Sequence, residues 1–219
     1  MDEHAVVEAA RLRARYREPH RHYHDLRHVE SVLAMVDELA DSQALSDDDR
    51  CVVRLAAWFH DAVYDPRASD NEHRSAELAR QTLSGVGAAT EAADEVARLV
   101  IVTTEHVVEA GDVRAAVLCD ADLSILGSAA DRYADYVRGV RAEYAFVDDA
   151  GFRKGRAAVL RRLLAREHVF ATSDARQRWE QAARVQVAHE ISLLETVPST
   201  RSNEGEAAAR AVGTSDPGP

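Results

Sequence analysis

Long apolar runs and cysteines are both scarce in this sequence of 219 residues. No stretch approaches the roughly 20 consecutive apolar residues that a membrane-spanning helix needs, and the first residues are acidic, unlike a secretion signal. The two cysteines, Cys51 and Cys119, stand in apolar runs without metal-ligand spacing, which favours two buried, reduced thiols over a disulfide. These absences predict a cytoplasmic protein that is not inserted in a membrane.

Basic residues are also in the minority, and the formal net charge is −11 at pH 7. This charge disfavours nonspecific binding to nucleic acid, because there is no basic excess to displace counterions. The sequence lacks a glycine-rich phosphate loop and any Ser-His-Asp or Cys-His arrangement in a plausible context, so covalent nucleophilic catalysis has no support. A small molecule is therefore the expected partner. A homodimer is possible, but the acidic surface indicates no interface for it.

What the sequence does contain is helical periodicity along most of its length. Apolar residues recur at three- and four-residue spacing, and Ser46 and Ser69 have the form of N-terminal caps. The β-branched run 100–104 and the run 117–119 have strand propensity, but no alternating partner strands accompany them, so we expect both to be helical. We predict an all-α bundle of about eight helices over residues 1–197, followed by a disordered tail over 198–219 that has few large apolar residues.

The stretch from Cys51 to Asp65 carries the strongest chemical signal. It is an apolar helical run with His60 and Asp61 at its centre, and burying a carboxylate there costs several kcal/mol without a counter-charge. A metal cation is the strongest counter-charge, although a satisfied core pair is the alternative. His28 also begins an apolar helical segment, so ligands from separate helices are predicted to converge, as in metal sites of helical bundles.

Two further acids, Asp120 and Asp122, lie in another apolar helix. They are two residues apart and so point about 200° away from each other on a helix, which means that only one of them can face the site. The spacing alone does not choose between them.

Four positions in this order, His28, His60-Asp61 and Asp122, resemble the signature of the HD superfamily of metal-dependent phosphohydrolases. The similarity extends over about residues 5 to 196 and is greatest to a bacterial branch of predicted phosphohydrolases. The resemblance implies an HD-domain helical bundle in which His28, His60, Asp61 and Asp122 ligate a divalent cation, namely Mn, Fe, Ni, Co, Zn or Mg. It also implies that water on the cation attacks phosphorus, with Asp61 in the catalytic machinery.

A second cation is a further hypothesis from the same resemblance. In two-metal relatives further histidines follow the His-Asp pair. Here Glu72 occupies one such place, and His106 lies where a later histidine would be. We predict a second site formed by Asp61, Glu72 and His106, with Asp61 bridging. Glu72 could instead act in catalysis by orienting the attacking water, or could cap its helix.

The substrate contacts are predicted from residue type and position. Lys154 and Arg156 flank Gly155, and a glycine between two cations lets backbone and side chains approach an anion together. His24 is expected at the mouth of the pocket. The leading interpretation is a hydrolase of a small phosphorylated metabolite, such as a nucleotide. The alternatives are a di-iron oxygenase of a small polyol, which the same fold also hosts, and a metal-stabilised sensor without catalysis.

Overall fold

The computed structural model describes residues 3–196, and this part of the chain is entirely helical, with nine α-helices and one 3-10 helix. In chain order the helices are α1 (Glu3–Arg15), α2 (Leu26–Ser42), α3 (Asp47–Phe59), α4 (Asn71–Gly85), α5 (Thr90–Val102), α6 (Val113–Leu123), the 3-10 helix η1 (Ser124–Gly127), α7 (Ala130–Glu143), α8 (Asp149–Leu164) and α9 (Ser173–Thr196). The predicted all-α class is confirmed, with one helix more than expected. The predicted disordered tail lies outside the described residues.

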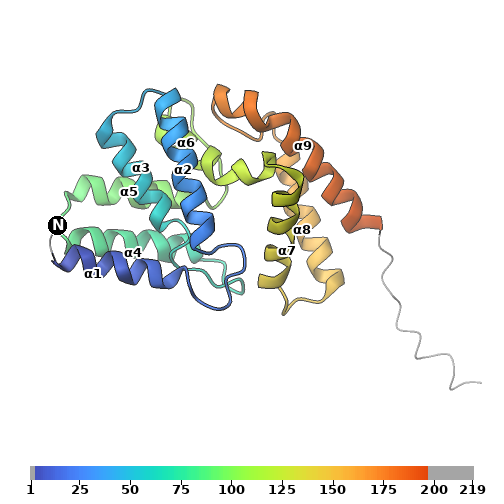
Figure 1. Cartoon of the computed structure of the whole chain (residues 1–219), viewed down its shortest axis with the longest axis horizontal. Coiled ribbons are helices and arrows are strands. Elements are labelled where there is room, and N and C mark those ends of the chain that lie inside the picture. Colours follow the sequence, from blue (N-terminus) through green and yellow to red (C-terminus); the bar gives the residue numbers. More distant parts are fainter. Residues whose placement is uncertain (1–2, 197–219) are drawn as a thin grey trace, which may run out of the picture.

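The helices form two groups, which Figure 1 shows side by side. Helices α1 to α6 make the larger group, in which α2 packs on α3 and α6, and α5 packs on α3 and α4. Helices α7 to α9 make the smaller group, joined to the first through η1, which packs along α9. The core residues include Val29, Val36, Leu99, Leu118 and Val187, so one apolar core runs through both groups.

Local sequence explains several helix boundaries. Ser46 caps α3 as predicted, because its hydroxyl accepts a hydrogen bond from the backbone N–H of Asp49 at 3.1 Å. Ser69 does not cap α4, which begins at Asn71 after Asp70. The runs 100–104 and 117–119 hold no strand; the second lies wholly in α6, and α5 covers the first as far as Val102. Tertiary packing overrides their β propensity, because Val100, Thr103 and the whole run 117–119 are buried.

The cysteines differ in exposure. Cys119 is buried and free, as expected, whereas Cys51 is exposed on α3, so the expectation of a buried Cys51 is wrong. The apolar run around Cys51 faces inward mainly through Val53, Ala56 and Ala57, which places Cys51 on the outer side of the same helix.

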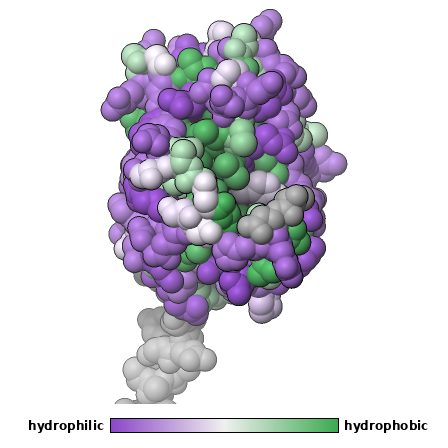
Figure 2. Space-filling view, turned by 90° about the vertical axis from the view of Figure 1, so that its left-hand side faces the viewer, coloured by the Kyte–Doolittle hydropathy of each residue, from purple (hydrophilic) through white to green (hydrophobic). Residues whose placement is uncertain are grey.

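Apolar side chains also reach the surface. A groove between α1, α3 and α4 is lined by Val6, Leu55, Trp58 and Leu83, among others. Figure 2 looks at the side of the molecule where α1 begins, and apolar side chains gather near the centre of that face. Within the described residues, no helix has the length and apolar character needed to cross a membrane.

Candidate metal centre

Three helices bring the four predicted ligands together. His28 lies in the first turn of α2, whose N-terminus is capped by the carboxylate of Asp25. His60 and Asp61 directly follow α3, and Asp122 lies in the last turn of α6. Because the ligands occupy helix ends that pack against one another, their positions are set by the same contacts that form the core.

The nitrogen and oxygen atoms of these four residues converge. The Nε2 atoms of His28 and His60 lie 3.1 Å apart. Asp122 Oδ1 is 3.2 Å from His28 Nε2 and 3.6 Å from His60 Nε2. Asp61 Oδ2 is 3.0 Å from His60 Nε2 and 3.5 Å from His28 Nε2. The ligand atoms of His28, His60 and Asp122 all lie within 4.8 Å of one another, which would allow them to hold one metal ion.

The hydrogen bonding of His60 fits a metal ligand. Its Nδ1–H donates to the carbonyl of Ala57 at 2.8 Å, which leaves the Nε2 lone pair directed toward His28 and the carboxylates. Two imidazole nitrogens and two carboxylates form a donor set that suits divalent transition metals. Both histidines are buried, at 6% exposure for His28 and 2% for His60, whereas the side chains of Asp61 and Asp122 are each 15% exposed.

The charges of the site stabilise each other. Burial alone lowers the pKa of His60, but Asp61 and Asp122 raise it well above its usual value. Burial alone raises the pKa of Asp61 and Asp122, whereas the histidines lower both well below the usual range. Positive charge is therefore strongly favoured at the point where the four side chains meet, whether protons or a cation supply it.

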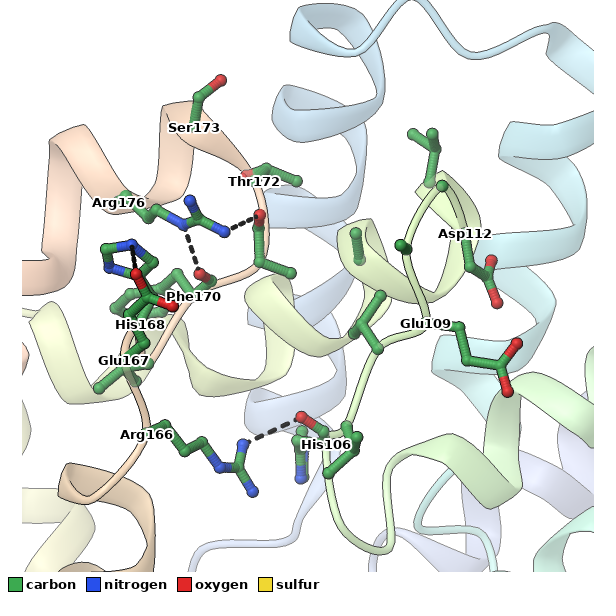
Figure 3. Close-up of a pocket in the computed structure, with 18 of the residues that line it drawn as sticks. His106, Glu109, Asp112, Arg166, Glu167, His168, Phe170, Thr172, Ser173 and Arg176 are labelled. Atoms are coloured by element: carbon green, nitrogen blue, oxygen red, sulfur yellow. Dashed lines mark hydrogen bonds and ion pairs between the residues drawn. The ribbon is translucent and has the colours of Figure 1, made fainter.

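His106 holds the other side of Asp122. Its Nε2 lies 2.8 Å from Asp122 Oδ2, while Oδ1 of the same carboxylate faces His28. The backbone of His106 is left-handed, with φ at 48°, and its carbonyl accepts a hydrogen bond from Arg166 at 2.9 Å (Figure 3). The contact places His106 against Asp122, whereas the predicted second cation site needs it near Asp61 and Glu72. That site stays a prediction.

Asp120 points away from the centre, as the helical spacing requires. It is 1% exposed and accepts hydrogen bonds from the backbone N–H groups of Ala171 and Thr172, both at 2.7 Å. Its role is to hold the segment that leads into α9.

Glu143 is a site residue that the sequence interpretation missed. Its side chain is fully buried at the end of α7. One carboxylate oxygen accepts hydrogen bonds from the backbone N–H groups of three successive residues, 22 to 24, at 2.7 to 2.9 Å. The other oxygen accepts from His24 Nδ1 at 2.7 Å and from the hydroxyl of Tyr64 at 2.8 Å. Glu143 thus fixes His24.

Arg21 was missed as well. Its buried guanidinium donates to the carbonyls of His24 and Asp61 at 2.9 and 2.8 Å, and to that of Ala62 at 3.2 Å. These hydrogen bonds fix the backbone that carries Asp61. Neither Arg21 nor Glu143 has a sequence signal that separates it from the many surface charges of this chain.

The predicted second-cation residue Glu72 and the predicted substrate-binding residues Lys154 and Arg156 differ in their exposure and contacts. Glu72 is half-buried in the first turn of α4. Lys154 is exposed in the middle of α8. Arg156 is nearly buried and pairs with Glu190 at 2.8 Å, so its charge is already balanced within the fold. The Lys154-Gly155-Arg156 triplet is part of a helix and does not form an anion-binding loop.

No protein-family model, curated protein or solved structure matches this chain. The likeness to the HD superfamily therefore depends on the residues named above, and the metal centre on the geometry of His28, His60, Asp61 and Asp122.

Proposed function

We propose that this protein is a metal-dependent hydrolase of a small phosphorylated metabolite, such as a nucleotide, and that it belongs to the HD superfamily. The observation that carries the proposal is the convergence of two imidazoles and two carboxylates from three helices. Such a set is costly to bury unless a cation balances it.

The centre also borders open space that a substrate can enter. A cavity of about 510 Å³ is lined by His28 and Asp122 on one side and by α7 on the other. This volume is within the usual range for small-molecule sites. A substrate in the cavity would therefore lie beside the proposed ligands.

The roles of the residues follow from their contacts. His28, His60, Asp61 and Asp122 would hold the cation, which when bound supplies an activated water and neutralises charge on phosphoryl oxygens. The hydrogen bond from His60 to Ala57 keeps its Nε2 free for binding. Arg21 positions Asp61 through the backbone, and His106 positions Asp122 through its second oxygen.

An activity screen with a matched pair of variants tests the proposal. Phosphatase, phosphodiesterase and pyrophosphatase substrates are assayed with Mn²⁺, Co²⁺, Ni²⁺ and Mg²⁺. Asp61→Ala should reduce turnover at least about 100-fold, because it removes a proposed ligand. Asp70→Ala, an exposed aspartate nine positions further on, should leave turnover unchanged. Turnover that survives Asp61→Ala would contradict the mechanism.

Metal content separates the alternatives. One cation per chain, unchanged in Glu72→Ala, would argue against the two-cation site that a di-iron oxygenase requires. Oxygen consumption with Fe²⁺ and a polyol would support the oxygenase, and bound metal without either activity would support the sensor.

A further inference from the structure

The cavity beside the metal centre has three arginines in its wall, and their partners differ. Arg27 forms an ion pair with Asp25 at 2.8 Å, and Arg138 forms one with Asp135. The guanidinium of Arg132 instead donates to the hydroxyl of Ser31, and within residues 3–196 it has no ion pair with a carboxylate. Among the described residues, Arg132 is therefore the cavity arginine whose charge no carboxylate balances.

One helical turn after Arg132, Tyr136 lines the same cavity. Residues four apart lie on the same face of a helix, so the two side chains leave α7 together. The ring of Tyr136 is fixed by Tyr23, with ring centres 4.6 Å apart, and by Tyr133, with ring centres 5.6 Å apart. Its position in the wall is thus set by packing.

The hydroxyl of Tyr136 has an unused hydrogen. Its oxygen accepts a hydrogen bond from Arg156 at 2.7 Å, and Arg156 is held by Glu190. Because Arg156 supplies the donor in this contact, the O–H of Tyr136 is left to donate elsewhere. In the described part of the chain nothing accepts it, whereas the neighbouring Tyr133 donates to Glu190.

We infer that Arg132 and Tyr136 form the subsite that binds the phosphoryl oxygens of the substrate in this cavity. The inference deepens the proposed function and rests on it for the identity of the anion. Within residues 3–196 the guanidinium has no acidic counter-ion and the hydroxyl has no acceptor, and two such groups on one helix face are donors that match phosphate oxygens. Arg132 and Tyr136 both line the cavity that His28 and Asp122 also line, so a phosphate bound there would lie next to the metal centre.

The assignment changes the role of Arg156. The sequence predicted that Arg156 would bind phosphate directly, yet its guanidinium contacts Glu190 and Tyr136. In this arrangement Arg156 acts through Tyr136. Its guanidinium donates a hydrogen bond to the hydroxyl oxygen of Tyr136, so the O–H of Tyr136 is directed toward another acceptor.

Binding of inorganic phosphate to the full chain, measured by calorimetry with and without Mn²⁺, tests the subsite. Arg132→Gln and Tyr136→Phe should each weaken binding by roughly tenfold or more, since each removes a hydrogen-bond donor to an anion. Arg138→Gln is the matched control, because it removes a paired arginine from the same helix and cavity, and should change binding less than about twofold.

Three results would overturn the subsite. They are absence of phosphate binding by the unaltered chain, unchanged affinity in Arg132→Gln, and an equal loss in Arg138→Gln, which would indicate a general charge effect. Arg132 is exposed, so its replacement keeps the test valid even if Tyr136→Phe fails to fold. If phosphate binds in the expected pattern but the Mn²⁺-loaded protein hydrolyses none of the phosphatase, phosphodiesterase and pyrophosphatase substrates named above, the subsite stands and the proposed hydrolysis fails.

Discussion

The two oxygens of Asp122 face different partners, and this division defines the metal centre at the scale of single residues. Oδ1 is turned toward the imidazoles of His28 and His60, and Oδ2 contacts His106. A ligand whose second oxygen is held in this way cannot rotate freely, which keeps the first oxygen directed at the centre.

Replacement of His106 by alanine should therefore weaken Mn²⁺ binding by roughly 10- to 100-fold, because the carboxylate of Asp122 loses the group that orients it. The change in affinity is measured by titration calorimetry. His168→Ala is the control, since His168 is an exposed histidine on the opposite side of the pocket shown in Figure 3. Equal affinity in the two variants would contradict the orienting role, and a fall from two bound cations to one would instead support the second cation site.

The sequence was informative about ligands and much less so about the residues that position them. His60 and Asp61 are conspicuous because they interrupt an apolar helix. Asp120 and Asp122 could not be separated by spacing, and the resemblance alone favoured Asp122. Glu143 resembles any acid on the exposed end of a helix, since its partners are backbone N–H groups about 120 positions earlier. Contacts this distant leave no local pattern.

At the scale of elements, α7 approaches the segment before α2 unusually closely. A Cβ atom at Gly139 would lie 2.9 Å from the Cβ of Tyr23 and 3.0 Å from the carbonyl oxygen of His22. The absence of a side chain at Gly139 is what allows α7 to pack on this segment. Gly155 on α8, by contrast, faces open space.

The two glycines should respond to alanine in opposite directions. Gly139→Ala should lower the free energy of unfolding by about 1–3 kcal/mol, because the methyl group overlaps a packed backbone. Gly155→Ala should raise it by about 0.5–1 kcal/mol, because alanine is the better helix former. Urea denaturation measures both. Stabilisation by Gly139→Ala would mean that the segment at 22–23 moves away easily.

The contact of Glu143 with the loop before α2 should also depend on pH. Burial raises the pKa of the carboxyl, but His24 and the backbone N–H groups of residues 23 and 24 lower it to about 2. Tyr64 and Tyr144 are the other titratable groups nearby. In the unfolded chain the pKa returns to roughly 4.3. The stabilisation is therefore complete above about pH 5 and is lost as the pH falls toward 2.

Unfolding free energies of the unaltered chain and of Glu143→Gln, measured between pH 2 and 7, check this expectation. The gap between the two should be largest above pH 5 and should close at low pH. Glu77→Gln, on the exposed face of α4, serves as the control. A gap that does not change with pH would show that the carboxylate charge is unimportant.

At the scale of the whole molecule, the all-helical class followed from periodicity, and the strand-like runs were resolved by the absence of partner strands. The division into two helix groups was not visible in the sequence, because the linking segment at 124–129 has the composition of any short connection. The centre spans α2, α3 and α6, so a cation held there would connect three elements of the larger group.

Divalent cations should therefore raise the melting temperature. At a Mn²⁺ concentration of 100 times Kd, the folded state gains about 2.7 kcal/mol, which corresponds to roughly 5–10 °C for a chain of this size. Differential scanning calorimetry with Mn²⁺ and then with excess chelator measures the shift. Asp122→Asn should abolish the shift in melting temperature. In this variant Asp120, which faces away from the centre, is not replaced. An equal shift in Asp122→Asn would place the cation elsewhere.

The attachment of residues 22–24 to Glu143 has a consequence for biosynthesis. A ribosome synthesises residues 22–24 long before it reaches position 143, so this segment lacks the Glu143 contacts while helices α2 to α6 can already assemble. His24 would then take its final position late, when α7 emerges, and truncated nascent chains that end before residue 143 should leave the segment open to proteases.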